Sequence, residues 1–355
     1  MKSNSLVSKR VQAKLSGMSP VIIMLVVFTI FALLNTVQGI NFLSPSNLST
    51  IINQACFLII VGIGQSLVIL VGGINLSMGA VMAFTTVLWG DMLLKDSGIN
   101  PLIPSLLILA TAALIGCFSG LMITKLNITP YIATFAVMYA FRGLAWVYLR
   151  NRVIYNLDKG FREIATGRLF KVGGFSVTVP MLIALGFLLF FYVLLRHTNF
   201  GRQLYFTGAN PTAARFSGIN TNRIIVLAYT ISTALAGFAG LMFMARLNST
   251  EPGMASKTHF EAITVSLIGG FVMTGGIGNI WGVAGGAIVV FTIQSGMNSL
   301  QLPGELQSMI NGLLIIFAVF LNHTLANKKM QLENDLSDKR LKIAGMDNVK
   351  GVSQS

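Results

Sequence analysis

Charged residues are scarce in this sequence of 355 residues: only 10% are Asp, Glu, Lys or Arg, whereas 54% are apolar. No charged residue occurs in segments 15–90 and 262–304. A membrane-spanning helix needs about 20 apolar residues, so these segments have room for about three and two such helices. The composition therefore excludes an ordinary soluble globular domain and indicates a polytopic membrane protein.

Residues for metal, cofactor and nucleotide chemistry are also lacking. The two cysteines, Cys56 and Cys117, lie in apolar segments and provide neither a disulfide framework nor metal-ligand spacing. The phosphate-binding pattern Gly-x-x-x-x-Gly-Lys-Ser/Thr is absent. We therefore predict no metal site, no cofactor and no enzyme activity, and any ATP must be bound by another chain. The net charge of +14 is typical of basic cytoplasmic loops, so nucleic acid is not expected as a partner.

The apolar segments predict an all-α membrane protein with about ten transmembrane helices. The expected spans are 20–37, 48–90 as two spans, 101–123, 130–148, 177–195, 224–245, 262–304 as two spans, and 306–321. The chain then divides into a polar N-terminal tail (1–18), a transmembrane domain (19–323) with a polar loop at 196–223, and a charged C-terminal tail (324–355).

Ten spans place both termini on the same side of the membrane. If that side is the cytoplasm, the inside segments carry most of the Lys and Arg, as the positive-inside rule requires. Every acidic residue before Glu333 then lies outside. We therefore predict that both termini are cytoplasmic, although the basic loop at 150–171 lies outside in this topology.

Two glycine-rich stretches interrupt the uncharged segments. Gly72-Gly73-Ile74-Asn75 lies in the first segment, and Gly275-Gly276-Ile277-Gly278-Asn279 lies in the second. Backbone groups that lose their helical hydrogen bonds within the membrane must be buried in protein or line a cavity. Helix breaks at corresponding positions in the two halves of a chain indicate a transport pathway. We predict two broken regions related by an internal repeat. Re-entrant hairpins, or a tight turn at the membrane surface for the first stretch, remain alternatives.

The polar segment 208–220 predicts a short helix of about two turns outside the membrane. Asn210 is a favourable N-cap, and Pro211 suits the first helical position. Gly218 suits the position just past the end of the helix. Bulky Phe216 would fit a groove on a partner protein. The alternative is an amphipathic helix that lies on the lipid headgroups.

Polar side chains within the spans are candidates for the pathway or for helix packing. Arg142 is the charged residue well inside a span, and we predict that it forms an intramembrane ion pair with Glu261. The spacing Gly116-x-x-x-Gly120 predicts close helix packing. Neutral hydrogen-bonding residues that could line a substrate pathway are Asn53, Gln54, Gln65, Asn75, Ser77, Asn279, Gln294 and Asn298.

Three motifs follow one another along the chain. They are Gly-Gly-Ile-Asn-Leu-Ser-Met-Gly (72–79), Gly-Ala-Asn-Pro-Thr-Ala-Ala-Arg-Phe-Ser-Gly-Ile (208–219), and Glu261-Ala262-Ile263 followed by Ile268-Gly269-Gly270 and Gly275-Gly276. Together they resemble the permease subunits of bacterial ABC importers for monosaccharides of the ribose, arabinose, xylose and galactose type. The resemblance covers about residues 20–323. The family usually has Asp where this chain has Asn75, which keeps hydrogen bonding but removes the charge.

The resemblance implies a sugar-transporting permease in the bacterial cytoplasmic (inner) membrane. Its partners would be a second permease copy or paralogue, an ATP-binding subunit and an extracytoplasmic sugar-binding protein. The helix at 208–219 would dock on the ATPase through Asn210, Pro211, Ala213, Arg215, Phe216 and Gly218. The resemblance leaves the sugar and the choice between homodimer and heterodimer open.

Two other classes of protein remain as alternatives. A passive channel or facilitator would need no ATPase and no docking helix. An intramembrane serine hydrolase with Ser119 as nucleophile would need a base within hydrogen-bond reach. The histidines, His197, His259 and His323, all lie near the ends of the predicted spans.

Overall fold

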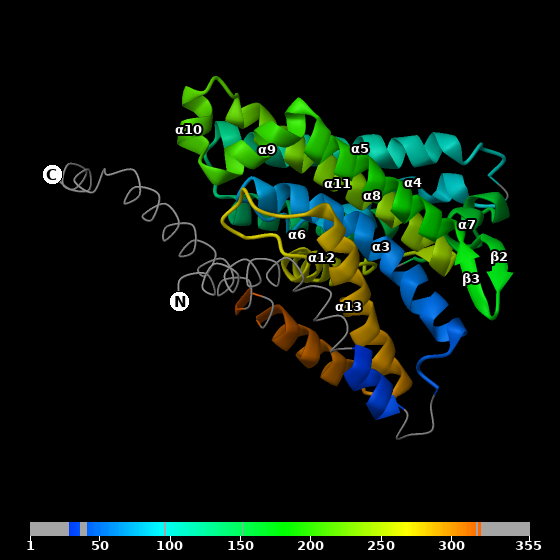
Figure 1. Ribbon diagram of the computed structural model, residues 1–355. Helices are drawn as coiled ribbons and strands as arrows, with labels where there is room; N and C mark the ends of the chain where they lie inside the picture. Colours follow the sequence, from blue (N-terminus) through cyan, green and yellow to red (C-terminus); the bar gives the residue numbers. More distant parts are fainter. Residues whose placement is uncertain (1–27, 36–40, 96, 151, 317–318, 321–355) are drawn as a thin grey trace, which may run out of the picture.

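The structure, a computed structural model, describes residues 28–35, 41–95, 97–150, 152–316 and 319–320 (Figure 1). Most of these residues are helical, and six helices are long and apolar enough to cross a membrane. The six are α3 (Pro45–Leu70), α5 (Leu102–Lys125), α6 (Pro130–Leu149), α8 (Val179–His197), α11 (Thr221–Leu247) and α13 (Ile280–Ser299). The prediction of a helical, polytopic membrane protein is confirmed at this level.

Shorter elements connect the long helices. They are α4 (Met78–Trp89), the 3-10 turn η1 (Gly90–Leu93), β1 (Ile154–Tyr155), α7 (Lys159–Thr166), β2 (Arg168–Val172), β3 (Phe175–Thr178), α9 (Asn199–Ala209), α10 (Pro211–Phe216), β4 (Ser249–Thr250) and α12 (Thr258–Ile268). Residues 28–35 and 304–316 are also helical. The two predicted tails and residues 20–27 of the first predicted span lie outside the described residues.

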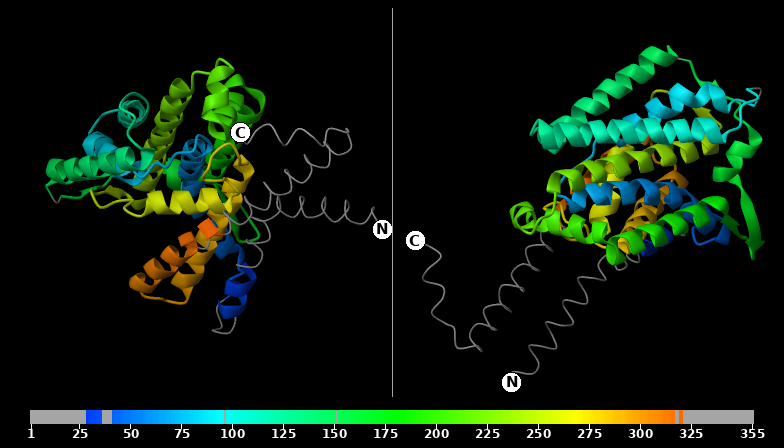
Figure 2. Two further views of the ribbon diagram at one scale, coloured as in Figure 1. Left: turned by 90° about the vertical axis from the view of Figure 1, so that its left-hand side faces the viewer. Right: turned by 90° about the horizontal axis from the view of Figure 1, so that it is seen from above.

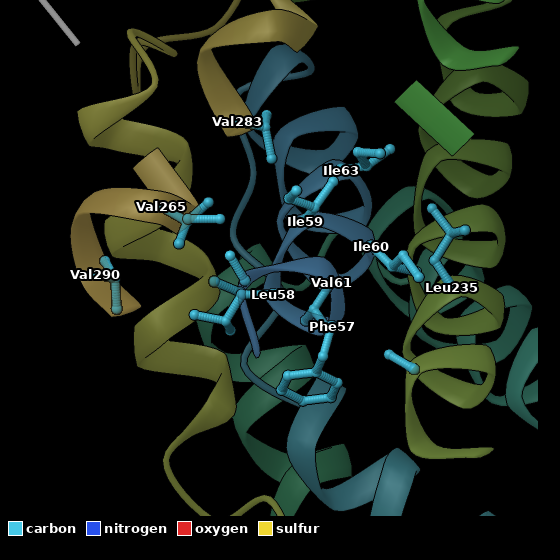
Figure 3. Packing of buried hydrophobic residues seen from close by; sticks show 14 of the residues in the cluster. Phe57, Leu58, Ile59, Ile60, Val61, Ile63, Leu235, Val265, Val283 and Val290 are labelled. Carbon is cyan, nitrogen blue, oxygen red and sulfur yellow. The ribbon is translucent and has the colours of Figure 1, made fainter. Parts of the chain in front are cut away.

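Helix α3 is the centre of the molecule. It begins at the N-cap Ser44, whose hydroxyl accepts a hydrogen bond from the Asn47 N–H at 3.3 Å, and it continues without any charged residue. It packs against α8, α11, α12 and α13. Figure 3 shows α3 side chains between Leu235 of α11 on one side and Val265 of α12 on the other. A helix that is apolar all round is expected in such a buried position.

The outer helices bury only one face. In their most apolar segments 33% of residues are buried in α5, 28% in α6 and 28% in α8, compared with 83% in α3. Their remaining apolar side chains are exposed, as lipid contact requires. Helix α5 packs closely on α11, because a Cβ at Gly116 would lie 2.5 Å from the carbonyl oxygen of Tyr229. The close packing predicted for this glycine is therefore confirmed.

The polar segment 150–171 is more ordered than a loop, so the all-α prediction is incomplete. It contains β1, α7 and most of β2, and β2 pairs with β3 as an antiparallel hairpin. The turn uses Gly173 and Gly174 at φ of +54° and +91°, values that favour glycine. The predicted span at 177–195 begins too early, since residues 177–178 belong to β3 and α8 starts next to Pro180.

The hairpin and α10 lie at opposite ends of the molecule. Figure 1 and the right-hand view of Figure 2 both place α10 at one end of the helical body and the β2–β3 hairpin at the other. The long helices α8 and α11 run between these ends. The polar segments at 150–171 and 196–223 therefore belong to different ends.

Candidate functional site

The two glycine-broken regions meet each other at the α10 end of the molecule. One is segment 71–77 between α3 and α4, and the other is segment 269–279 between α12 and α13. The Gly276 N–H donates to the carbonyl oxygen of Leu70, the last residue of α3, at 2.9 Å. The stretches predicted to break the membrane segments are thus joined directly by a backbone hydrogen bond.

The end of α9 lies in the same contact. A Cβ at Gly208 would collide with the Leu70 carbonyl oxygen, and one at Gly275 would lie 2.8 Å from the Gly208 carbonyl oxygen and 3.0 Å from the Gly72 nitrogen. Gly72 and Gly275 have φ of +75° and +90°. Glycine is therefore required here both by backbone conformation and by space.

A second link joins α9 to the same loop. The Tyr205 hydroxyl donates to the carbonyl oxygen of Gly278 at 2.9 Å. Helix α10 follows α9 after the single residue Asn210. The α9–α10 pair is consequently attached to both broken regions by contacts within a few residues of α10.

Asn75 holds the first broken region through a buried polar network. Its Nδ2 donates to the Ser232 hydroxyl at 3.1 Å, and its Oδ1 accepts from the Ser77 N–H at 3.1 Å and the Ser77 hydroxyl at 2.7 Å. All three side chains are fully buried. The side-chain amide of Gln65 pairs with the backbone of Asn75. With the amide nitrogen facing the Asn75 carbonyl oxygen at 3.1 Å, the amide oxygen accepts from the Asn75 N–H at 3.3 Å.

Two further side chains hold the carbonyl oxygen of Ile74. The Tyr229 hydroxyl and the Thr134 hydroxyl both donate to it at 3.3 Å. Nearby, the Ser66 hydroxyl donates to Ser266 at 2.9 Å and joins α3 to α12. Backbone freed by the break is therefore paired inside the protein, as burial at this depth requires.

The sequence did not identify Tyr229, Ser232 and Ser266 as members of this network. The sequence signal that could have identified them is their polar type within otherwise apolar helices. Polar residues at such positions often bond between helices. Their partners could not be identified because helices distant in sequence meet here.

The other predicted pathway residues are dispersed. Asn53 accepts from the Thr178 hydroxyl at 3.1 Å, Asn279 caps α13 by accepting from the Trp281 N–H at 3.2 Å, and Asn298 accepts from Gln307 at 3.1 Å. Gln54 is half-buried on α3. The structure thus brings Gln65, Asn75 and Ser77 together and leaves the remaining five residues elsewhere.

The predicted ion pair between Arg142 and Glu261 is not formed. Glu261 accepts a hydrogen bond from Gln294 of α13 at 2.9 Å, whereas the Nε and Nη2 atoms of Arg142 are buried without a hydrogen-bond partner among the described residues. On α12, His259 is close enough to Arg142 to interact with it electrostatically. Two residues turn a helix by about 200°, so Glu261 points away from the side that carries His259.

The short helix predicted in segment 208–220 is present as α10, with both predicted caps. The Asn210 side chain accepts from the Ala213 N–H at 3.0 Å, and Gly218 has a φ of +82° just past the end. Ala214 is buried, while Ala213 is exposed. Phe216 is 89% exposed, the largest exposure among the exposed apolar side chains of the described residues.

Arg215 already has one partner within the chain. Its Nε donates to the Thr221 hydroxyl at 2.8 Å, which links α10 to the start of α11. The side chain itself remains exposed. Arg215 therefore fixes the orientation of α10 and still presents its charge at the surface.

Comparison with known proteins places most of the described chain in one family. The model described as "Branched-chain amino acid transport system / permease component" matches residues 47–319. The ribose import permease protein of Bacillus subtilis (strain 168) is 32% identical over 293 residues, which cover 82% of this chain and 89% of the relative. No solved structure matches this chain.

Relatives from Escherichia coli (strain K12) are similarly close. Its ribose import permease protein is 31% identical over 84% of this chain and 92% of its own length. Its galactose/methyl galactoside import permease protein is 30% identical over 87% of this chain and 94% of its own length. The resemblance inferred from the three sequence motifs is therefore confirmed.

Proposed function

The chain belongs to the family of transport-system permease components that residues 47–319 match, and from this premise we propose that it is the membrane subunit of an ATP-driven monosaccharide importer. The relatives named above are import permeases for ribose and for galactose or methyl galactoside. The observation that carries the proposal is the contact of both broken regions with α9, next to α10. Movement of α9 would act on both breaks together.

The ATP-binding subunit docks on α10 in this proposal. The chain has no phosphate-binding loop of its own, and no acidic residue occurs between Glu163 and Glu251. The exposed Phe216 is the expected anchor, because aromatic residues in desolvated pockets often dominate binding energy. Ala213, exposed one turn earlier, allows close approach of the partner.

The proposed topology has ten membrane crossings with both termini in the cytoplasm. Helices α4 and α12 are too short to cross alone, and each supplies one arm of a broken region. The long helix precedes the first break as α3 and follows the second break as α13. Because the order of long and short helix differs between the two breaks, the internal repeat that we propose comprises only the two broken regions. Both regions lie at the α10 end of the molecule.

The sugar passes beside the broken regions, and a second permease copy or a paralogue completes the pathway. Asn75 and Ser77 are buried in this structure, so their proposed contribution is to hold the first break rather than to contact the sugar in this state. At the opposite end a cavity of about 430 Å³ is lined by polar residues that include Asp91, Lys95 and Arg152. We place the docking of the extracytoplasmic sugar-binding protein at that end.

Reconstitution tests the proposal directly. The purified permease, with candidate ATP-binding and sugar-binding proteins from the same organism, is placed in liposomes and supplied with a panel of labelled sugars. ATP-dependent uptake of one or a few monosaccharides is expected. Uptake without ATP would indicate a passive facilitator, and no uptake of any monosaccharide would reject the substrate class.

The orientation has its own test in intact cells. A cysteine placed in the β2–β3 hairpin should react with an impermeant thiol reagent, and one placed at Thr212 should not. Cys56 and Cys117 must be replaced first, so that only the introduced cysteine is labelled. The reverse labelling pattern would overturn the orientation.

A further inference from the structure

A cavity of about 460 Å³ lies where the last turn of α8 meets the first turn of α13. Its lining residues are Tyr192, Leu195, Arg196, Tyr205, Gly278, Asn279, Ile280 and Trp281. The lining combines one cation, three aromatic rings and aliphatic side chains, and it includes no acidic residue. The binding partner suggested by this chemistry is an anion with an apolar portion.

Two independent features make the cavity electropositive. The exposed Arg196 donates through Nη1 to the Tyr192 hydroxyl at 2.9 Å, and its guanidinium carbon lies 5.7 Å from the centroid of that ring. These contacts hold the guanidinium in place and leave further N–H groups to donate. The N-terminus of the 20-residue helix α13 adds the positive end of its dipole. A phosphate group fits both features, because guanidinium binds phosphate oxygens in a fork.

The surroundings of the cavity are those of a lipid headgroup site. Exposed apolar side chains follow one face of α8 at helical spacing and lead to Arg196: Leu182, Leu185, Leu189 and Val193. Trp281 is 41% exposed, and its ring centroid lies 5.8 Å from that of Tyr192. Trp and Tyr at the end of an apolar span are typical of the membrane–water interface.

From these observations we propose that the cavity binds the phosphodiester headgroup of an anionic phospholipid. Arg196 and the first turn of α13 hold the phosphate, Trp281 and Tyr192 flank the glycerol region, and an acyl chain lies along the apolar face of α8. Basic pockets between transmembrane helices are known to bind anionic headgroups in this way. The site is independent of the sugar and of the ATPase.

The position of the cavity gives the lipid a consequence for the broken region. Gly278 and Tyr205 are both part of the lining, and their hydrogen bond ties α9 to the loop between α12 and α13. A lipid bound there braces this contact from the membrane side. Anionic lipid should therefore stabilise the α9 attachment more than zwitterionic lipid does.

Native mass spectrometry of the full-length chain in detergent tests the site. Phosphatidylglycerol or phosphatidylcholine of equal chain length is titrated, and the fraction of lipid-bound protein is measured. Wild type should bind phosphatidylglycerol more tightly, and Arg196→Gln should weaken that binding about fivefold, the value for one basic residue near a charged headgroup. Arg196→Lys should retain part of the preference because the positive charge remains.

Three comparisons make the result decisive. Arg223→Gln removes another exposed arginine, in the first turn of α11, and should leave lipid binding unchanged. Trp281→Leu should weaken binding while Arg196 stays in place. Equal affinity of wild type for both lipids, or equal losses in Arg196→Gln and Arg223→Gln, would overturn the proposal. Equally tight binding of glycerol phosphate without acyl chains would also overturn it, because the site would then bind a small anion rather than a lipid.

Discussion

The two glycine-broken regions contact each other and the end of α9, but they are held in place in different ways. In segment 71–77 the side chains of Asn75 and Ser77 are fully buried and bond to each other and to Ser232. In segment 269–279 several side chains are exposed, among them Thr274, Ile277 and Asn279. Buried, fully paired polar groups rigidify a structure, so the first break is the more fixed of the two.

The second break buries the apolar side chains of Phe271 and Val272, but its hydrogen bonds are made chiefly by backbone atoms. Gly276 donates its N–H to α3, Gly278 accepts from Tyr205 of α9, and Gly270, Gly275 and Gly276 all have positive φ. Such a loop can change conformation without breaking a buried network of polar side chains. The comparison suggests that movement of α9, which contacts both breaks, displaces the second break more than the first, and four predictions test this difference.

The largest effect is expected from Gly208→Val, which attacks the point that both regions share. The added side chain would collide with the Leu70 carbonyl oxygen and the Gly276 nitrogen. Overpacking of this kind typically costs 1–3 kcal/mol, and we expect about 3 kcal/mol here because the obstacle is backbone. The unfolding temperature in detergent and the rate of sugar-stimulated ATP hydrolysis by the assembled transporter should both fall.

Gly186→Val is the matched control for Gly208→Val. Gly186 lies in α8, and nothing lies within 4 Å of a Cβ built there. The control should unfold and hydrolyse ATP like wild type. Normal stability and coupling in Gly208→Val would show that α9 does not need close contact with the broken regions.

The second prediction compares the two breaks by replacing one asparagine in each with alanine. Asn75→Ala leaves the buried N–H and hydroxyl of Ser77 without their acceptor, and an unsatisfied buried group costs about 1–3 kcal/mol. Asn279→Ala removes an exposed N-cap, which typically costs about 1 kcal/mol. The free energy of unfolding should fall more for Asn75→Ala. An equal or larger loss for Asn279→Ala would contradict the claim that the first break is the more fixed one.

The sequence predicted the local features well and the long-range contacts poorly. The caps Asn210 and Gly218 follow from residue type and short spacing, so α10 could be located before its structure was known. The breaks themselves were visible as glycine pairs in uncharged segments. The contact of Gly208 with Leu70 and Gly276 was not visible, because it joins three segments that are far apart in the chain.

Two errors have identifiable physical causes. The sequence predicts a loop over segment 150–171. Strand β2 buries neither face, so its sequence lacks the alternation of apolar and polar residues that identifies a strand. The Arg142–Glu261 pair was inferred from charge and depth alone. The direction in which a side chain leaves its helix decides which partner it meets, and Glu261 faces Gln294 of α13.

A smaller effect concerns the exposed surface of α10 that we propose as the docking site of the ATP-binding subunit. Phe216→Ala should weaken binding of the ATP-binding subunit by about 1–2 kcal/mol, the loss of a modest hot spot. Ala213→Glu should weaken it further by placing a charge on the docking surface. Both residues are exposed, so the stability of the isolated permease should not change. Co-purification of the ATP-binding subunit from membrane vesicles gives the measurement.

Phe170→Ala is the control for the docking surface. Phe170 is 58% exposed on the hairpin at the opposite end of the molecule. Its replacement should leave binding of the ATP-binding subunit unchanged. If Phe216→Ala and Phe170→Ala behave alike at normal permease level, α10 is a surface helix without a docking role.

The smallest effect is a coupling energy that should be close to zero. Arg142→Ala and Glu261→Ala each remove a charge, but the two residues do not contact each other, so the double variant should lose the sum of the single losses within about 0.5 kcal/mol. Glu261→Ala with Gln294→Ala should instead depart from the sum by 0.5 kcal/mol or more, about the lower limit for residues in direct contact. Unfolding free energies of the two double variants and their singles give both cycles. A coupling for Arg142 with Glu261 as large as that for Gln294 with Glu261 would restore the ion pair and would tie the start of α12, and hence the second break, to α6.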